Sequence, residues 1–485
     1  MRPTFLAAVL LPVAAAASAQ EQARSAVVKV YTTYQSPNYM RPWEMRTQQS
    51  LTGSGAIIAG HRILTNAHVV SDQTFVRVQR ADLPDKCVAR VVAVSHEFDL
   101  ALLTTDDAFF EGTQPLAIGK LPAIGDAVSA LGFPTGGTRV AVTKGVVSRI
   151  DRGSYSHSWR SNLVCQIDAA INPGSSGGPV VGDGAVVGVA FQSGSGENIG
   201  YIVPAPVIEH FLKDIEDGHR DGAPSVPLVW QVLENPQLRE ACGLSDGQRG
   251  VRVTKISAPF DGDDMLRAGD VLLGVDGFDI ANDGTIEFRP GERIEFTYAV
   301  DRKQLGDSLA LRILRDGKPR EVTLALSAAN GCADLVPRAQ YETTPSYYVL
   351  GGLVFAPLTL NYIHEWSDWN DVPIGLKRYY YEMRTAANAE RREVVVLIDV
   401  LADELNVGYE FYQSVVSEAN GHRVNSLKDL VTAIEGHDGP FHTIVLEDRD
   451  AHIVLKRDGL AERSKEILRR YRVPEDRSDD LKATK

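Results

Sequence analysis

Cysteine is scarce in this sequence. The 485 residues include four cysteines, at Cys87, Cys165, Cys242 and Cys332. They are too few and too scattered for a disulfide framework or a zinc site, so stability must come mainly from packing. Two interpretations stay open for Cys242 and Cys332, which flank one predicted domain: a disulfide between them, or two buried thiols.

Positive charge is also in short supply. The 63 acidic side chains outnumber the 50 basic ones, which gives a net charge of -13. Such a chain would repel a polyanion, and no long stripe of Lys and Arg compensates, so we expect no nucleic-acid partner. Phosphate-binding-loop motifs and metal-ligand motifs are both missing, and we therefore expect no cofactor and no metal.

No apolar run is long enough to cross a membrane. A span needs about 20 apolar residues, and the run from Phe5 to Ala17 is shorter. It follows Arg2 and ends in Ala17-Ser18-Ala19, the small-x-small pattern that signal peptidase cuts. We predict a signal peptide over residues 1–19 rather than an anchor, and no membrane span after its removal. The mature chain is expected to be exported, to the periplasm or the cell exterior, with an organelle lumen as the alternative.

The chain is too long for one hydrophobic core, because single cores stop growing at about 250 to 300 residues. From Val27 to about Leu212, short β-branched runs alternate with Gly, Pro, Asn and Asp, which is typical of β-sandwiches or barrels. An amphipathic helix over Pro206–Glu216 closes that region. Strands and short helices return in two further modules, where a strand is predicted over Tyr348–Phe355. The predicted domains are 20–222, 223–335 and 336–473, followed by a charged tail, 474–485, expected to be frayed.

A glycine-rich segment, Asp168-Ala-Ala-Ile-Asn-Pro-Gly-Ser-Ser-Gly-Gly-Pro179, carries the sharpest chemical signal. A serine nucleophile in acyl transfer needs an exposed hydroxyl and nearby backbone N–H groups aimed at the developing oxyanion. Glycines let the chain bend tightly enough to supply both. Ser176 is the predicted nucleophile, and the N–H groups of Gly174 and Ser176 are the predicted oxyanion donors. Taken alone, the same glycines are equally typical of a β-turn with no chemistry.

Two more residues complete the predicted site. A hydroxyl is a poor nucleophile at neutral pH unless an imidazole accepts its proton, and His68 lies in a small-residue turn after an apolar strand. The imidazole needs a buried carboxylate on its other nitrogen. Asp99 begins an apolar strand, where burial without a partner would be costly. A core histidine and a solvated strand cap are the alternatives, whereas Asp168 is expected to brace the loop before Ser176. The order His, Asp, Ser is that of the chymotrypsin-type arrangement.

The surrounding motifs resemble those of the HtrA (Deg) protease family. The resemblance rests on four segments in the family's order: Thr65–His68, Asp99–Leu103, Asp168–Pro179 and Ile199–Pro204. Three more look like the plant-type Deg subgroup and extend the resemblance over nearly the whole mature chain: Asp276–Thr285, Gly291–Ile294 and Asn406–Tyr409. Ser175 departs from the family, which commonly has Asn there, and we expect a less rigid loop rather than inactivity.

The resemblance implies a mainly β fold, with a chymotrypsin-like double β-barrel followed by two α+β PDZ-like domains. It also implies a serine endopeptidase that degrades unfolded or damaged exported proteins, and that assembles as a trimer or a multiple of trimers. Independence of ATP is expected because the phosphate-binding loop is missing. The alternative is a polypeptide-binding chaperone or scaffold with little proteolytic activity.

The same resemblance assigns the peptide-contacting residues. The pocket walls are expected at Ile171 and at Ala190, Phe191 and Gln192, and no Asp lies at the pocket floor, so cleavage should follow small or medium aliphatic residues. Asp151–Asn162 is the candidate sensor loop. Gly250, Val251 and Val253 resemble the loop and strand with which a PDZ domain captures a peptide C-terminus, and the alternative is a structural spacer. Gly351–Val354 is the candidate loop of the last domain, whose groove is either open or filled by the protein itself.

Overall fold

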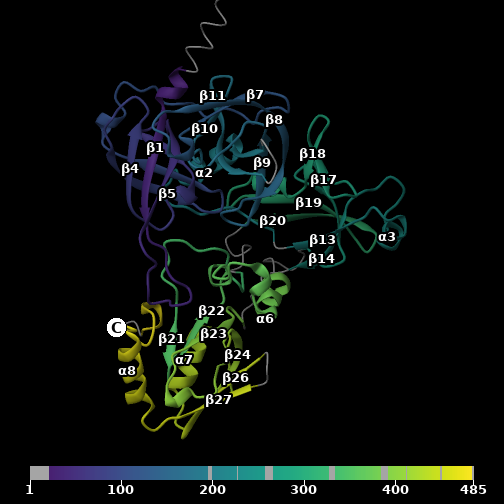
Figure 1. Cartoon of the computed structure of the whole chain (residues 1–485). Helices are drawn as coiled ribbons and strands as arrows, with labels where there is room; N and C mark the ends of the chain where they lie inside the picture. Colours follow the sequence, from purple (N-terminus) through teal and green to yellow (C-terminus); the bar gives the residue numbers. More distant parts are fainter. Residues whose placement is uncertain are drawn as a thin grey trace, which may run out of the picture. The chain divides into compact units, whose positions relative to one another are not determined.

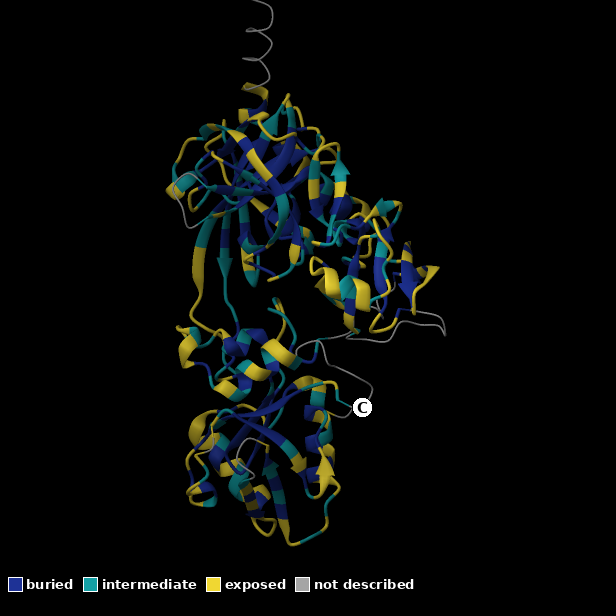
Figure 2. Ribbon diagram, turned by 90° about the vertical axis from the view of Figure 1, so that its right-hand side faces the viewer, coloured by how far each residue is buried: buried dark blue, intermediate teal, exposed yellow. Residues whose placement is uncertain are grey.

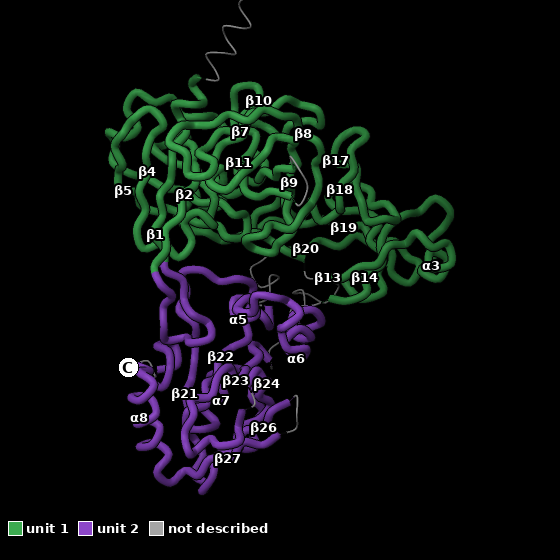
Figure 3. Tube along the Cα trace, in the orientation of Figure 1, with its two compact units in different colours: residues 1–34, 48–256, 260–331 green, residues 35–47, 257–259, 332–485 purple. Residues whose placement is uncertain are grey.

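The computed structural model describes residues 21–194, 199–226, 228–256, 266–326, 334–383, 391–410, 412–447 and 451–482. They divide into two compact units (Figure 3). Unit 1 holds the described residues of 1–34, 48–256 and 260–331, and unit 2 holds those of 35–47 and 332–485. The predicted signal peptide and Cys332 lie outside the described residues, so cleavage after Ala19 stays a prediction and both interpretations of Cys242 and Cys332 stay open. Among the described helices, none is both long and apolar enough for a membrane span.

The first two thirds of unit 1 are two closed β-barrels (Figure 1). The strands of the first are β1 (Val27–Tyr34), β2 (Gln49–Ile58), β3 (Arg62–Thr65), β4 (Gln73–Arg80), β5 (Cys87–Ser95) and β6 (Leu100–Thr104). The strands of the second are β7 (Ala127–Gly132), β8 (Ala141–Ser154), β9 (Ser161–Ile167), β10 (Pro179–Gly182), β11 (Ala185–Ser193) and β12 (Gly200–Pro204). Their orders around the barrels are β1-β2-β3-β6-β5-β4 and β10-β11-β12-β9-β8-β7. The predicted chymotrypsin-like double barrel is confirmed.

Apolar side chains from the strands fill the barrels, as Figure 2 shows by the buried residues along them. Four consecutive residues of β6, Leu100 to Leu103, are fully buried, so both faces of this strand are covered. Helix α2 (Ala205–Asp214) follows β12 and buries Phe211 in the same core. Asp99, which directly precedes β6, is therefore buried together with this strand.

The rest of unit 1 is the first α+β module. Its elements are β13 (Leu228–Val232), α3 (Pro236–Ala241), β14 (Val251–Ile256), β15 (Val271–Val275), β16 (Phe278–Asp279), β17 (Thr285–Arg289), β18 (Glu292–Glu295), α4 (Tyr298–Asp301), β19 (Ser308–Arg315) and β20 (Lys318–Ala325). The sheet order is β13-β14-β15-β19-β20, with β16 paired to β15 and with β17 and β18 forming a separate hairpin. The module is tied to the second barrel by a largely buried ion pair, in which Arg152 Nε lies 2.8 Å from Asp301 Oδ2.

Unit 2 contains the second α+β module. Its elements are β21 (Tyr348–Leu350), β22 (Leu353–Pro357), α5 (Leu360–Ile363), α6 (Ile374–Arg378), β23 (Val395–Val400), β24 (Ser414–Ala419), β25 (His422–Arg423), α7 (Leu427–Glu435), β26 (Phe441–Leu446), β27 (Ala451–Lys456) and α8 (Leu460–Tyr471). The sheet order is β21-β22-β23-β24-β26-β27, with β25 paired to β24. The single strand predicted over Tyr348–Phe355 is wrong, because Gly351 and Gly352 adopt positive φ angles of 58° and 86° and turn the chain into a hairpin.

The C-terminal segment is not frayed over its described part, contrary to expectation. The amide of Val349 donates to the carbonyl of Asp476 at 2.7 Å, and the amide of Ser478 donates to that of Tyr347 at 3.1 Å. Arg477 also pairs with Glu435 of α7 at 2.7 Å. The charges that suggested a solvated tail are satisfied by partners in unit 2.

Residues 35–47, which connect β1 to β2, belong to unit 2 although they lie inside the predicted domain 20–222. Tyr39 is buried in a hydrophobic cluster of that unit, and the ring of Trp43 meets the ring of Tyr347 edge-on at 5.6 Å. The amide of Tyr39 donates to Glu365 Oε1 at 3.1 Å. The predicted domain boundaries stay predictions.

Candidate active site

His68 and Asp99 meet at the ends of two paired strands. β3 pairs with β6, with Thr65 opposite Ala101, so the turn after β3 lies beside the residue that precedes β6. His68 Nδ1 donates to Asp99 Oδ2 at 2.7 Å, and the His68 amide donates to Asp99 Oδ1 at 2.9 Å. The Asp99 side chain is 1% exposed and that of His68 is 32% exposed. A buried acid thus holds an imidazole whose other side remains accessible.

The surroundings of His68 alter its affinity for a proton. Burial lowers the pKa of His68, but the charge of Asp99 and the hydrogen bond to it raise the pKa, and the net pKa lies above the ordinary value of 6.5. A carboxylate in this position fixes the tautomer with hydrogen on Nδ1 and stabilises the imidazolium that forms when Nε2 takes a proton.

Ser176 lies in the turn between β9 and β10, and contacts from the first barrel fix that turn. The amide of Ser54, in β2, donates to the carbonyl of Ser176 at 2.8 Å. The Ser54 hydroxyl donates to the carbonyl of Gly174 at 2.7 Å and accepts from the amide of Phe133 at 2.9 Å. Gly177 has a φ of 84°, and a Cβ there would lie 2.1 Å from the Ser54 carbonyl oxygen. Only glycine fits this position.

The two predicted oxyanion donors have no acceptor among the described residues. Gly174 adopts a φ of 95°, and neither its amide nor that of Ser176 donates a hydrogen bond to any of the described residues. Both N–H groups are thus available for a substrate oxygen. Their role as oxyanion donors stays a prediction.

The predicted pocket residues border the Ser176 turn. The amide of Gly177 donates to the carbonyl of Ala190 at 2.8 Å, which fixes β11 alongside the turn. Ile171, Ala190 and Phe191 are buried, and Gly200 lies so near Ile171 that a Cβ there would be 2.8 Å from its Cδ1. Gln192 is partly exposed, and its Oε1 accepts from the amide of Ser156 at 3.0 Å.

The sequence predictions missed several residues of this region. Ser54 carried a signal, because Gly53 and Gly55 flank it within a strand, and glycine in a strand marks close approach of another backbone. A Cβ on Gly53 would in fact lie 3.2 Å from the Ser176 carbonyl oxygen. His157 also lies near the site, with its ring centroid 6.1 Å from that of His68. As a lone histidine within the predicted sensor loop, it carried no signal.

The predicted peptide-capturing residues of the first α+β module lie on a strand with both edges paired. Val251 and Val253, in β14, are opposite Val232 and Trp230 of β13. Val251 is also opposite Leu272 of β15, and the amide of Gly250 donates to Asn282 Oδ1 at 3.2 Å. A peptide can add to β14 only if β13 leaves, so peptide capture by this module stays a prediction.

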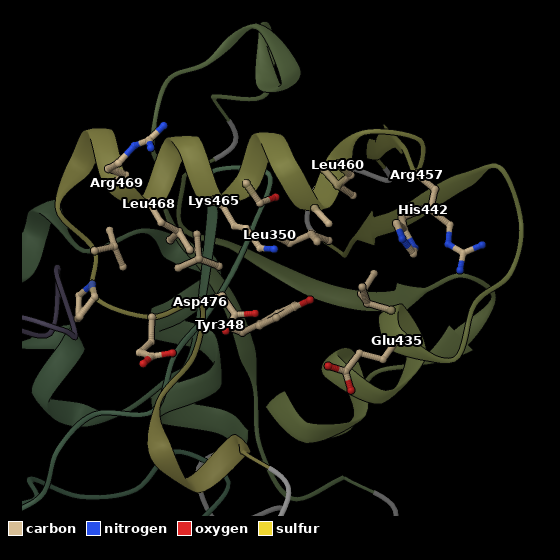
Figure 4. Close-up of a pocket in the computed structure, with 17 residues that line it drawn as sticks. Tyr348, Leu350, Glu435, His442, Arg457, Leu460, Lys465, Leu468, Arg469 and Asp476 are labelled. Carbon is tan, nitrogen blue, oxygen red and sulfur yellow. The ribbon is translucent and has the colours of Figure 1, made fainter.

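A cavity of about 840 Å³ lies in unit 2 (Figure 4). Helix α8 runs along one side, and β21 with the C-terminal segment forms the other. Next to it, the amide of Gly351 donates to Ser464 Oγ of α8 at 3.2 Å, so the predicted loop of this module is already contacted by the protein itself. Among the described residues of both units, no cluster of three or more His, Cys, Asp or Glu is suited to a metal ion.

Comparison with known proteins decides the family. Residues 53–189 match the family described as trypsin-like peptidase domain, and residues 336–480 match the PDZ domain family. Putative protease Do-like 3, mitochondrial, of Arabidopsis thaliana is 39% identical over 96% of this chain and 81% of its own length. The chain belongs to the Do-like (Deg/HtrA) protease family.

A second curated relative and a solved structure support the same family. Protease Do-like 2, chloroplastic, of Arabidopsis thaliana is also 39% identical, over 94% of this chain and 75% of its own length. Among solved structures, the HtrA-type protease AlgW with tripeptide is 27% identical and superposes with a TM-score of 0.50, covering 64% of this chain and 96% of that one. This Do-like protease is therefore a serine endopeptidase that acts on peptide or protein substrates, which confirms the predicted enzyme class.

Proposed function

We propose that this Do-like protease is an ATP-independent endopeptidase that degrades unfolded or damaged exported proteins, with Ser176 as nucleophile, His68 as general base and Asp99 as its orienting acid. The observation that carries the assignment is the 2.7 Å hydrogen bond from His68 Nδ1 to Asp99 Oδ2, made by an acid that is 1% exposed. A surface acid–histidine pair would not be desolvated in this way.

The proposed reaction is acyl transfer in two steps. Ser176 Oγ attacks the scissile carbonyl carbon while its proton passes to His68 Nε2, and the amides of Gly174 and Ser176 hold the oxyanion. His68 then gives the proton to the leaving amine, and the C–N bond breaks. In the second step a water molecule gives a proton to His68 and hydrolyses the Ser176 ester by the same route.

The decisive test compares the wild type with Ser176→Ala. We expect casein hydrolysis and covalent labelling by a fluorophosphonate in the wild type, and neither in Ser176→Ala. Ser175→Ala is the matched control, because this neighbouring serine is not the proposed nucleophile and should keep both activities. Equal rates for wild type and Ser176→Ala would remove the assignment. A wild type that binds denatured casein without cutting it would favour the chaperone or scaffold alternative.

The proposed specificity is for small or medium aliphatic residues before the scissile bond. The buried pocket residues Ile171, Ala190 and Phe191 are all apolar, which supports this choice over a basic side chain. Sequencing of casein fragments should place Val, Ala or Ile at most cleavage sites. A majority of Arg or Lys would contradict the proposal. Addition of ATP should leave the rate unchanged.

The proposed location is an exported compartment, reached after removal of residues 1–19. The mitochondrial and chloroplastic names of the Arabidopsis relatives make an organelle lumen a second candidate beside the periplasm and the cell exterior. N-terminal sequencing of the purified protein should start at Gln20. Family membership supports a homotrimer or a multiple of trimers, which light scattering after size-exclusion chromatography would measure.

A further inference from the structure

The connection between β8 and β9, residues 155–160, touches several parts of the proposed site. Tyr155 is fully buried and its ring lies 4.5 Å from that of the pocket residue Phe191, measured between centroids. The next amide, of Ser156, donates to Gln192 Oε1 at 3.0 Å. The third residue, His157, is 8% exposed and lies beside His68.

The same connection is bound to the turn that presents Asp99. His157 Nε2 lies 2.9 Å from Nδ1 of His96, a hydrogen-bond distance. The carbonyl of Glu97 accepts from Ser158 Oγ at 3.2 Å and from Asn162 Nδ2, at the start of β9, at 2.8 Å. The amide of Asp99 in turn donates to the carbonyl of His96 at 3.2 Å, so His96 and Asp99 share one turn. His157 therefore contacts both the turn that contains Asp99 and the ring of His68.

A hydrogen bond between two imidazoles limits their protonation. One ring nitrogen must carry hydrogen while the facing nitrogen offers a lone pair, so the bonded pair holds at most one positive charge. When both rings are protonated, Nδ1 of His96 and Nε2 of His157 are both donors, and they repel each other. The hydrogen bond is then lost.

The charged and titratable neighbours of the pair come from each element that surrounds it. His68 and Asp99 lie on the catalytic side, and Glu97 lies in the turn of His96 with Arg160 at 3.7 Å. The phenol of Tyr155 donates to the carbonyl of Leu163, and His210 of α2 packs edge-on against Phe98. The Asp99 carboxylate is already hydrogen-bonded to His68, so a second cation on the pair would face the imidazolium of His68 at low pH.

We propose that the His96–His157 pair positions the His68–Asp99 dyad for proton transfer, and that double protonation of the pair releases the dyad. His96 and His157 are positioning residues in this scheme, since neither reacts with substrate. The inference rests on the proposed triad. It predicts two ionisations on the acid side of the pH profile of kcat, one from His68 and one from the pair.

Variants with neutral amides test the inference in the full chain. His157→Gln and His96→Asn each place an amide near the position of the original ring nitrogen, so they can keep a hydrogen bond that does not titrate. We expect each to keep kcat within about threefold at pH 8, while the acid side of the profile changes from second-order to first-order dependence on proton concentration. His157→Ala, which has no partner for His96, should lower kcat about 10-fold with little change in KM, below the 10²-fold that a 1 Å misplacement can cost.

His61→Gln is the matched control, because His61 is exposed on the first barrel and pairs with Asp107. It should leave both kcat and the second-order acid side unchanged. A first-order acid side in the wild type, or an unchanged kcat in His157→Ala, would overturn the inference. If His157→Ala does not fold, the two amide variants still decide through the order of the acid side. Fluorophosphonate labelling of wild-type Ser176 separates the two hypotheses: without labelling the triad itself fails, and with labelling but no effect of the variants only the positioning role fails.

Discussion

The two barrels hold their proposed catalytic groups in different ways. In the first barrel, the pairing of β3 with β6 brings His68 and Asp99 within hydrogen-bond distance of each other. In the second barrel, the Ser176 turn depends on Ser54, a residue of the first barrel, for hydrogen bonds to Gly174, Ser176 and Phe133. The proposed acid and base thus come from paired strands of one barrel, whereas the turn of the proposed nucleophile is held by contacts between the two barrels.

The largest expected effect tests the first barrel. Asp99→Asn should lower kcat about 10⁴-fold, because an amide beside Nδ1 favours the wrong tautomer of His68. The measurement is kcat on a casein-derived peptide at pH 8. Asp107→Asn, a change in an exposed acid, is the control and should have no such effect. A comparable loss in Asp107→Asn or in Asp106→Asn would contradict the assignment of Asp99.

The next effect tests the junction between the barrels. Ser54→Ala removes the hydroxyl that bridges Gly174 and Phe133, and should lower kcat by about 10- to 100-fold through misplacement of the oxyanion donors. The rate of fluorophosphonate labelling should fall with it, whereas the pKa of His68 should not change. Ser50→Ala, in an exposed position of the same strand, is the control. Equal labelling rates in Ser54→Ala and Ser50→Ala would show that the Ser176 turn keeps its geometry without the Ser54 hydroxyl.

The pH dependence gives a smaller effect. The Asp99 carboxylate raises the pKa of His68 above 6.5, and a protonated imidazole cannot act as a base. As pH is lowered, kcat/KM should therefore reach half its plateau value at a pH above about 6.5. The interaction with Asp99 affects the free energy of unfolding in the opposite direction to activity. Its contribution is fully present below the pKa of His68 in the unfolded chain, and it is lost as pH rises through the pKa of His68 in the folded protein. The His157→Gln background isolates His68, and Asp99→Asn in that background should move the midpoint to lower pH. An unchanged midpoint in Asp99→Asn would show that Asp99 does not raise the pKa of His68.

The smallest expected effect is that of changing Asp168, an acid of the second barrel, and it is to be compared with that of changing Asp99. Asp168 is exposed, and its Oδ1 accepts from the amide of Val146 at 2.6 Å, as a brace rather than a triad member would. Asp168→Asn should change kcat by less than about threefold, the usual range of a surface substitution. A loss near that of Asp99→Asn would mean that an acid of the second barrel takes part in proton transfer.

Local patterns predicted those parts of the molecule that depend on neighbours in the sequence. The strands Val27–Tyr34 and Leu100–Thr104 lie within the region predicted to be rich in strands, because β-branched and apolar runs between turn residues favour strands. The His68 and Asp99 motifs are likewise local, since each lies at a strand end, and their catalytic roles stay predictions. The hairpin at Gly351 failed because an apolar run hid the turn, and the tail failed because the partners of Asp476 and Arg477 lie more than 40 residues away in sequence or in other elements.

Contacts between segments that are distant in the chain gave fewer signals in the sequence than the local patterns did. The hydrogen bond of His96 with His157 joins residues 61 positions apart, and no periodic pattern in the sequence predicts such a contact. Ser54 was detectable only through its flanking glycines. Candidates for the residues that the proposed chemistry requires could be chosen from the sequence, whereas most of the residues that contact them could not.

The assignment of residues 35–47 to unit 2 means that this unit is not one continuous stretch of chain. Expression of residues 334–485 alone would leave out Tyr39 and Trp43 and so remove part of that unit's core. A protease domain ended before residue 332 would conversely expose those aromatic rings to water. Any swap of unit 2 between relatives would have to carry two separate gene segments, and recombination at a single crossover would separate residues that fold together.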